Sequence, residues 1–195
     1  MKEKEWMNYT VKPLDSSNGE VFTDFLGNLD FSLTPHWATC FCRFYYSDCS
    51  IEEWAAKSGE TNKAEALEDI RKGNMKGYLA FDGDKCIGWC SANDIVRFPR
   101  LSEDVSHLIE GKRTGCTICY VIHPEYRRQG VARLLLQYAV EDFRQKGFDH
   151  LLAFPVVADT PAETHYRGSV NMYLENGFQE IGNQDNVKAM LLELN

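Results

Sequence analysis

Short runs in which apolar and polar residues alternate predict the strands of this chain, because alternation is the pattern of a half-buried strand. We interpret as strands the runs 9–14, 37–46, 115–122, 148–156 and 187–194. Two further apolar runs within 77–93 flank the sequence Asp-Gly-Asp-Lys. This turn predicts a hairpin, because Asp and Gly tolerate positive φ. The run 37–46 is assigned from its dense aromatic and β-favouring residues.

Other segments space their apolar residues three and four apart, which predicts amphipathic helices. The expected helices are 20–29, 50–57, 63–72, 131–146 and 169–176. Ser50, followed by acidic residues, is a suitable start for the second helix, and Thr61 or Asn62 is expected to cap the third. Gly147 is expected to end the fourth helix. The segment 97–108 is expected to be irregular or short-helical.

The order of these elements predicts one mixed α/β domain over residues 1–195. A strand at 115–122, a helix at 131–146 and a strand at 148–156 form a unit whose two strands should be parallel, with a right-handed crossover. The hairpin at 77–93 adds antiparallel pairs to the same sheet. No repeat or linker divides the chain.

Composition and charge narrow the classes of partner. The chain has 195 residues, 44% hydrophobic and 26% charged, with a net charge of −8. It has no basic stripe of the kind that binds nucleic acid, and no apolar run near the ~18 residues of a membrane span. We therefore expect a cytoplasmic protein with neither nucleic acid nor membrane as partner. An acidic surface would instead attract a cationic small molecule.

The seven cysteines raise the alternative of a zinc-stabilised interaction protein. Cys40 with Cys42, and Cys116 with Cys119, have spacings that metal sites use. Cys116 and Cys119 lie in a predicted strand, where residues three apart point to opposite faces. We therefore expect buried, reduced thiols and no metal.

The junction between the strand 115–122 and the helix 131–146 carries the clearest chemistry. A helix that follows a strand directly presents unpaired N–H groups and a positive dipole end, which together bind anions. Gly130 and Ala132 would let an anion approach the backbone, and Arg127, Arg128 and Arg133 add positive charge. A diphosphate-bearing ligand fits this turn.

Two common phosphate-binding patterns are absent from the sequence, namely GxxxxGK[ST] and GxGxxG. The pattern present is RxxGxA, formed by Arg127, Gly130 and Ala132 within "VIHPEYRRQGVA". It resembles the coenzyme-A signature of the GNAT superfamily of acyl-CoA-dependent N-acetyltransferases.

A second segment, "SVNMYLENGFQEIG", resembles a later motif of the same superfamily, in which a tyrosine lies four residues before a Gly-Phe pair. Here these residues are Tyr173, Gly177 and Phe178. Where many relatives carry an asparagine, seven residues before the tyrosine, this chain has Tyr166. The resemblance implies the GNAT fold, a mostly antiparallel central sheet with one splayed parallel pair, flanked by helices.

The resemblance also implies a set of coenzyme-binding residues and a catalytic one, with acetyl-CoA as co-substrate. Tyr173 would be the general acid that returns a proton to the departing thiolate. The coenzyme would be bound by Tyr120, Val121 and Ile122 along the pantetheine arm and by Arg127, Arg128, Gln129, Gly130, Val131, Ala132 and Arg133 around the diphosphate.

The implied reaction is direct attack of a neutral primary amine on the thioester, so a base must first remove a proton from the ammonium. Glu125, Asp94, Glu163 and His165 all remain candidates for that base. The acceptor would be a small-molecule amine or a protein amino group, and the chain could form a homodimer. A non-enzymatic CoA-binding or regulatory module of the same fold is the alternative function.

Aromatic residues between 37 and 46 are expected to form core and pocket wall, some of them at the acceptor site, since ligand pockets are commonly aromatic. They are Trp37, Phe41, Phe44, Tyr45 and Tyr46.

Overall fold

The computed structural model describes residues 9–102, 105, 107, 109, 111–157 and 165–194. These residues contain a seven-stranded sheet with the order β1-β2-β3-β4-β5-β7-β6. Its strands are β1 (Thr10–Pro13), β2 (Gly77–Asp82), β3 (Lys85–Asp94), β4 (Thr114–Ile122), β5 (His150–Ala153), β6 (Gln179–Gln184) and β7 (Val187–Glu193). β4 and β5 are parallel, and the other neighbouring pairs are antiparallel. The predicted mixed sheet with one parallel pair is confirmed.

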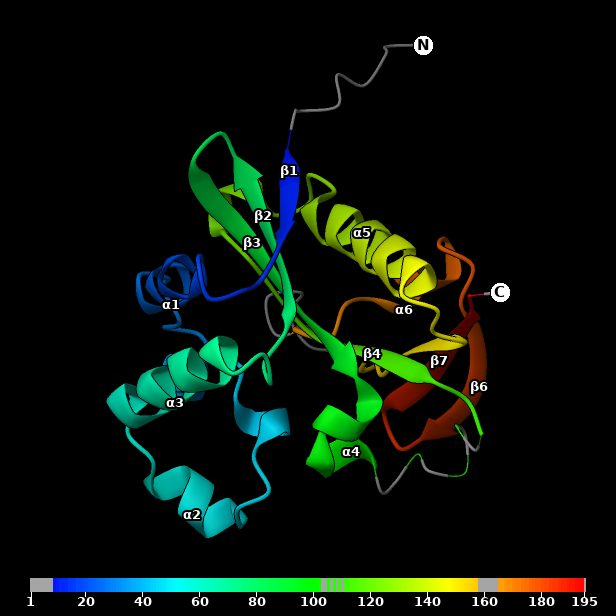
Figure 1. The fold of residues 1–195 in the computed structure, drawn as a ribbon, viewed down its shortest axis with the longest axis horizontal. Helices are drawn as coiled ribbons and strands as arrows, with labels where there is room; N and C mark the ends of the chain where they lie inside the picture. Colours follow the sequence, from blue (N-terminus) through cyan, green and yellow to red (C-terminus); the bar gives the residue numbers. More distant parts are fainter. Residues whose placement is uncertain are drawn as a thin grey trace.

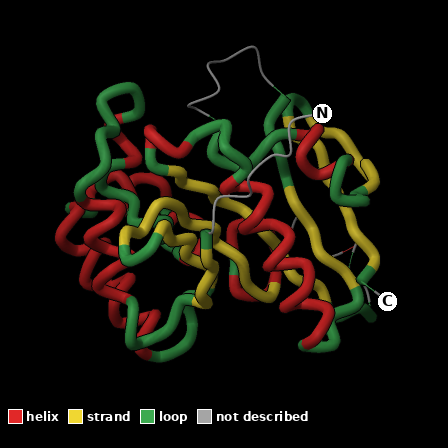
Figure 2. Tube along the Cα trace, turned by 90° about the horizontal axis from the view of Figure 1, so that it is seen from above, coloured by secondary structure: helices red, strands yellow, loops and turns green. Residues whose placement is uncertain are grey.

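Helices cover both faces of this sheet (Figures 1 and 2). They are α1 (Gly19–Gly27), α2 (Ile51–Ala56), α3 (Gly59–Arg71), α4 (Pro99–Ser102), α5 (Val131–Gln145) and α6 (Val170–Leu174). In Figure 1, α1 and α3 lie on one side of the sheet and α5 on the other. Short 3-10 turns occur at Pro35–Trp37, Phe44–Tyr46, Ile95–Arg97 and Pro124–Tyr126.

The apolar core lies in two layers, one on each face of the sheet. Phe22 of α1, Ile70 of α3 and Trp89 of β3 belong to the layer under the N-terminal helices. The layer under α5 contains Val131, Leu135, Leu136, Ala139 and Phe143, the buried residues of the helix. The apolar spacing in the sequence predicts a stripe at 131, 135, 138, 139 and 143, so it differs from the buried face only at Tyr138, which is half-buried, and Leu136. Both helical faces are therefore held by burial of apolar area, at about 25 cal/mol per Å².

Glycine lets α5 approach the sheet closely. A Cβ at Gly115 would lie 2.4 Å from Cε1 of Phe143, and a Cβ at Gly88 would lie 2.9 Å from Cγ1 of Val131. The first contact is at the C-terminal end of α5 and the second at its first residue. These two glycines thus set how near both ends of the helix lie to β3 and β4.

The strand predicted at 37–46 is wrong. Pro35–Trp37 and Phe44–Tyr46 form 3-10 turns, and Phe41 and Cys42 have φ of 43° and 53°. These left-handed φ values are incompatible with a strand. Four of the five aromatic residues that suggested a strand instead line a cavity, described below.

The structure also differs from the sequence prediction in three smaller features: a helix cap, an edge strand and a β-bulge. Ser58, rather than Thr61 or Asn62, caps α3 by accepting a hydrogen bond from the Thr61 backbone. The sequence prediction omitted β6, a polar edge strand that pairs only with β7. Its side chains lack the alternation that identifies half-buried strands.

The bulge affects the cysteines. The register between β3 and β4 shifts opposite Thr117 to Cys119, where β4 has one extra residue. A bulge reverses the alternation of side chains beyond it. Cys116 and Cys119 consequently join the same core layer, so the expectation that they point to opposite faces is wrong. All seven cysteines are free thiols, and the described residues contain no group of three or more His, Cys, Asp or Glu arranged to hold a metal ion.

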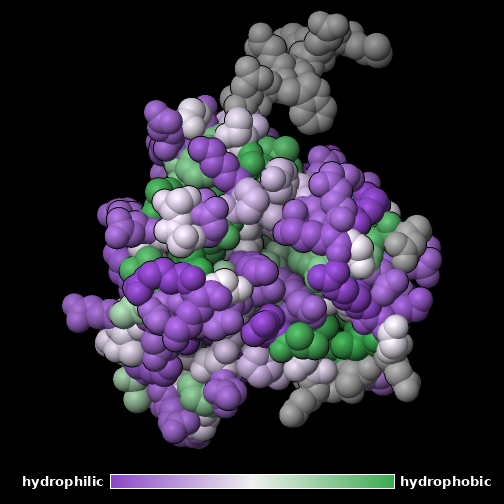
Figure 3. All heavy atoms as spheres, in the orientation of Figure 1, coloured by the Kyte–Doolittle hydropathy of each residue, from purple (hydrophilic) through white to green (hydrophobic). Residues whose placement is uncertain are grey.

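Charged and polar side chains cover most of the face drawn in Figure 3, with apolar groups in separate smaller areas. Among the helices of the described ranges, none combines the length and the apolar character that crossing a membrane requires.

Candidate active site

The turn between β4 and α5 has the geometry of an anion site. Gly130 is the N-cap of α5 with φ of 86°, and its carbonyl accepts the first helical hydrogen bond, from Leu134 at 2.9 Å. The N–H groups of Val131, Ala132 and Arg133 precede that bond and are therefore not used within the helix. A Cβ at Gly130 would meet no atom within 4 Å. Glycine is required here by its backbone conformation, and the space beside its Cα is open.

The three arginine side chains at this turn differ in whether they are already hydrogen-bonded or ion-paired within the protein. Arg127 is exposed, and its Nε donates to the Ile122 carbonyl oxygen at 3.3 Å. Arg133 is ion-paired with Glu175, which follows α6. Arg128 is exposed with φ of 60°, and no ion pair of Arg128 occurs among the described residues. Arg128 is thus the arginine of this turn whose charge is least committed within the protein.

The side chains of two other predicted diphosphate residues, Val131 and Gln129, are already committed within the protein. The Val131 side chain is buried with 1% exposure under the sheet, so only its N–H faces the turn. Gln129 is engaged on both ends of its amide: its Nε2 donates to the Glu125 carbonyl at 2.6 Å, and its Oε1 accepts from the Tyr9 hydroxyl at 3.1 Å. These bonds fix the turn in place.

β4 and β5 separate before β4 ends. Their parallel pairing stops at Thr117 with Ala153, and three residues later the Tyr120 N–H donates to the Tyr166 carbonyl at 2.6 Å. Backbone groups alternate along a strand, so those of Ile122 point to the same edge as those of Tyr120. The splay predicted from the resemblance is therefore present. A ligand pairing with this edge would have to displace the Tyr166 carbonyl to reach Tyr120.

Tyr173 lies beneath the splay, fully buried, and its hydroxyl donates to the Arg167 carbonyl at 2.7 Å. Burial raises the pKa of Tyr173 well above its ordinary value, because the phenolate would be poorly solvated. The hydroxyls of Thr117 and Tyr120 lie close enough to act on that pKa. The phenol is consequently held in the protonated form that a proton donor needs.

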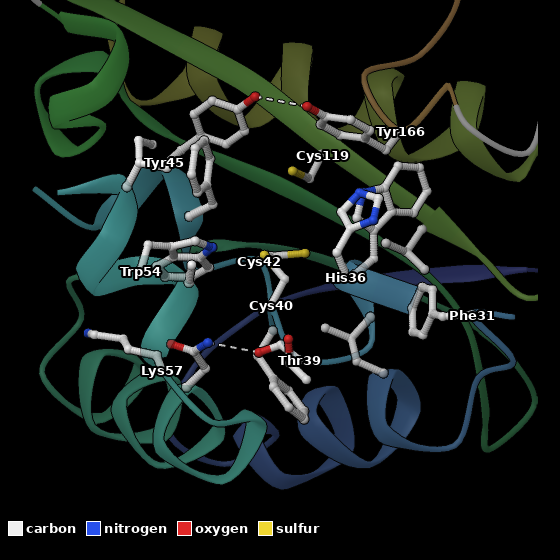
Figure 4. A pocket seen from close by; sticks show the side chains of 18 residues that line it. Phe31, His36, Thr39, Cys40, Cys42, Tyr45, Trp54, Lys57, Cys119 and Tyr166 are labelled. Carbon is white, nitrogen blue, oxygen red and sulfur yellow. Dashed lines mark hydrogen bonds between the residues drawn. The ribbon is translucent and has the colours of Figure 1, made fainter. Parts of the chain in front are cut away.

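A cavity of about 710 Å³ opens on the face of β4 opposite α5 (Figure 4). The side chains of Cys119 and Val121 reach it from β4, and the rest of its wall comes from α1, α2, α3, the loops around them and Tyr166. Its aromatic members are Phe31, Trp37, Phe41, Phe44, Tyr45, Trp54 and Tyr166. Four of the five aromatic residues expected at a pocket wall line this cavity. Tyr46 lies outside the cavity wall, and its hydroxyl donates to the Lys76 carbonyl at 3.1 Å.

Tyr166 connects the two sides of the site. Its carbonyl occupies the Tyr120 N–H at the splayed edge, while its side chain lies in the cavity wall. The Tyr166 hydroxyl is 3.0 Å from the Tyr45 hydroxyl, and its ring lies 5.0 Å from that of Trp37, centroid to centroid. The Arg167 guanidinium donates to both hydroxyls. The residue that departs from the motif is thus part of the cavity wall.

The candidate bases named from the sequence lie elsewhere. Glu125 is exposed in the turn and paired with Lys85 at 3.3 Å, Asp94 caps the turn Ile95–Arg97, and His165 lines a separate small cavity. Glu163 lies outside the described residues. The imidazole in the large cavity is that of His36, which the sequence reasoning passed over because no nearby motif marked it.

The mixed sheet with one splayed parallel pair, flanked by helices on both faces, is the architecture of an acyltransferase fold. The chain belongs to the acetyltransferase (GNAT) family, whose profile matches residues 36–178, more than half of the sequence. No curated protein matches the chain.

Solved structures share the fold at low sequence identity. The PaiA N-acetyltransferase of Thermoplasma acidophilum, solved with coenzyme A, is 16% identical with a TM-score of 0.56, covering 96% of this chain and 99% of its own. A GNAT acetyltransferase of Streptococcus pneumoniae is 16% identical with a TM-score of 0.55, covering 95% and 99%. The yncA protein of Salmonella typhimurium, solved with acetyl-CoA, is 13% identical with a TM-score of 0.52, covering 96% and 94%.

Proposed function

We propose that this protein transfers the acetyl group of acetyl-CoA to a primary amine by direct attack. The observation that carries the proposal is the junction of β4 and α5, where an open helix N-terminus follows a splayed strand edge. Two proteins with this fold were solved with coenzyme A or acetyl-CoA, which supports a ligand of this class. The diphosphate would lie at the N–H groups of Val131, Ala132 and Arg133, with Arg128 beside it.

The reaction requires a neutral amine, a thioester and a proton donor. The amine nitrogen attacks the thioester carbonyl carbon, the carbon–sulfur bond breaks, and the electron pair of that bond leaves on sulfur. Tyr173 would donate its phenolic proton to the thiolate, since its buried hydroxyl is protonated and lies under the splay. The attacking nitrogen, positively charged once the C–N bond forms, releases a second proton to solvent, and the Tyr173 phenolate regains one from solvent. The products are a neutral amide and free coenzyme A.

We propose direct attack by the amine rather than an acyl-cysteine intermediate, because two thiols in the cavity, those of Cys40 and Cys42, are poorly suited to act as nucleophiles. A nucleophilic cysteine reacts as the thiolate. Burial raises the pKa of the Cys40 thiol to about 11. The pKa of the Cys42 thiol is also raised, first by its hydrogen bond with Cys119 and then by burial. These two thiols are therefore poor nucleophiles at neutral pH.

We assign the removal of the amine proton to His36. It lines the cavity into which the amine must enter, and imidazole is the commonest general base in enzymes. A His36→Gln variant should lose about tenfold or more in kcat at neutral pH and recover activity at alkaline pH, where the amine is already neutral. A loss of equal size at every pH would contradict a role in proton removal.

The proposal is tested by isothermal calorimetry with acetyl-CoA together with a thiol-release assay over a broad panel of amines. Binding combined with amine-dependent CoA release supports transferase function. Binding without release for any small amine or peptide would overturn it in favour of a non-catalytic CoA-binding module. A protein that binds no acetyl-CoA would overturn both.

A further inference from the structure

We propose that the acetyl acceptor is a primary amine carried on an uncharged, apolar and mainly aromatic body, which fills the large cavity on the opposite face of β4 from α5. This inference rests on the proposed acetyl transfer and names its substrate class. It concerns a small molecule with the size of an arylalkylamine and excludes polyamines and basic peptide side chains.

The cavity wall favours an apolar ligand. Eighteen of the described residues line the cavity, and none of these eighteen carries a carboxylate. The one lysine, Lys57, has its ammonium bound to both Glu65 oxygens, at 2.8 and 2.9 Å. This ion pair lowers the pKa of Glu65 and commits the Lys57 charge to a residue outside the wall. An aromatic body would thus enter a nearly uncharged surface that its burial would stabilise.

A cationic body would be disfavoured for the same reason. A second ammonium group in the cavity would lose its hydration without gaining a counter-ion, which is costly in an apolar environment. The acidic net charge of the chain, −8, suggested a cationic partner. Among the residues that the structure describes, no carboxylate lies in the cavity wall, so this expectation does not extend to the acceptor.

The cavity also gives the ligand a direction. In Figure 4, Tyr45, Tyr166 and Cys119 lie at one end of the cavity, and Thr39 and Lys57 lie at the other. The first end adjoins β4, whose edge would hold the coenzyme arm. The amino group therefore belongs at the first end, with the apolar body extending toward Thr39.

A polar anchor is present at the far end. Asn62 lines the cavity and is 2% exposed, and its amide nitrogen donates to the Thr39 carbonyl at 2.9 Å. Its Oδ1 is buried and has no hydrogen-bond partner among the described residues. Unpartnered buried acceptors are costly, so this oxygen suits a hydroxyl or N–H group on the distal end of the ligand.

The volume of about 710 Å³ sets the size of the body. Cavities of roughly 300–1,000 Å³ hold drug-sized ligands. Methylamine would leave most of this space unfilled and so gain little from it. An acceptor with one or two rings would use it.

The inference is tested by measuring kcat/KM for the whole protein with acetyl-CoA and each of five amines: methylamine, spermidine, 2-phenylethylamine, tyramine and tryptamine. We expect the three arylalkylamines to exceed methylamine and spermidine by about tenfold or more. Tyramine, with its distal hydroxyl, should exceed 2-phenylethylamine by about fivefold if Asn62 accepts from it. Equal values for these two would overturn the Asn62 assignment.

A pair of variants on α2 ties the preference to the cavity. Ala55 lines it, whereas Ala56, next on the same helix and exposed, lies outside the lining. Ala55→Trp should raise the KM for tryptamine by about tenfold or more, while Ala56→Trp leaves it within about twofold. In both variants the KM for acetyl-CoA should stay within about twofold, which shows that the fold is intact. In Ala56→Trp, whose substitution lies outside the cavity lining, the turnover of methylamine should also stay within about twofold.

Two outcomes would overturn the substrate class while the proposed function stands. One is a kcat/KM for spermidine or for a lysine peptide that equals the kcat/KM for the arylalkylamines. The other is a preference for octanoyl-CoA over acetyl-CoA that Ala55→Trp abolishes, because the cavity would then hold the acyl chain. Binding of acetyl-CoA with no turnover of any amine would instead refute the proposed function itself.

Discussion

At the scale of single residues, Tyr173 is placed by hydrophobic packing and by the hydrogen bond that its hydroxyl donates. Its ring lies 5.1 Å from that of Phe178, centroid to centroid, in the layer under α5. Its hydroxyl is committed to the Arg167 carbonyl, so donation to a thiolate would require the O–H to turn from that carbonyl. The role of Tyr173 as general acid stays a prediction.

Tyr173→Phe should lower kcat by about 100-fold, because a general acid contributes at least that factor. Acetyl-CoA affinity should stay within about twofold, and the free energy of unfolding should fall by about 1 kcal/mol for the lost hydrogen bond. Stopped-flow turnover, calorimetry and urea unfolding measure the three quantities. Tyr138→Phe, on α5, is the control, and an unchanged kcat in Tyr173→Phe would remove the assignment.

The pH profile provides a second check on Tyr173. Burial raises its pKa above the ordinary value, so the hydroxyl keeps its proton at least up to about pH 10. We therefore expect that loss of this proton causes no decline in kcat between about pH 7 and 9.5. A descending limb near pH 8 that Tyr173→Phe removes would contradict the raised pKa.

Residue types alone could predict part of this site. The spacing of Arg127, Gly130 and Ala132 identifies the turn, because a helix N-terminus and a glycine are local features. His36 and Asn62 could not be predicted, because they reach the cavity through tertiary packing of segments with no motif. Tyr166 could be identified only as a departure from the motif, and its place in the cavity wall depends on Tyr45 and Trp37.

At the scale of elements, the N-terminus of α5 is the predicted diphosphate site. The double variant Arg127→Ala with Arg128→Ala should raise the Kd for coenzyme A by about tenfold or more and weaken its salt dependence. Pantetheine, which lacks the diphosphate, should bind with unchanged affinity. Arg144→Ala, in the last turn of the same helix, is the control, and equal losses for coenzyme A and pantetheine would contradict this placement.

Close packing of α5 on β4 gives a stability prediction. Gly115→Ala would set a Cβ 2.4 Å from the Phe143 ring, so the helix must shift or the ring must leave its place. Overpacking of this kind costs about 1–3 kcal/mol in the free energy of unfolding. Gly27→Ala, where a Cβ meets no atom within 4 Å, is the matched control and should cost nothing. Thermal or urea unfolding compares the two variants, and equal stability would contradict the close contact.

Regular elements were predicted where one local pattern dominated. The stripe on α5 and the hairpin of β2 and β3 follow from periodicity and turn chemistry. The segment 37–46 failed because aromatic residues favour strands and cavity walls alike. Two consecutive left-handed residues, Phe41 and Cys42, then decide against a strand. These two left-handed conformations belong to a segment that packs around the cavity, and the pattern of residue types in the sequence does not predict them.

At the scale of the whole molecule, the sheet separates the site into two sides. The predicted anion site lies at the end of β4 that leads into α5, and the apolar cavity lies on the opposite face of the same strand. β4 contributes to both sides, with the backbone edge of Tyr120 and Ile122 facing the splay and the side chains of Cys119 and Val121 facing the cavity. Two substrates could therefore meet at this strand without competing for space.

A crystal structure of the protein with acetyl-CoA tests this account most directly. We predict the diphosphate at the N–H groups of Val131 to Arg133, the pantetheine arm along the β4 edge at Ile122, and the thioester between Tyr173 and the opening of the cavity. A diphosphate bound elsewhere, or a thioester on the far side of the sheet from the cavity, would contradict it.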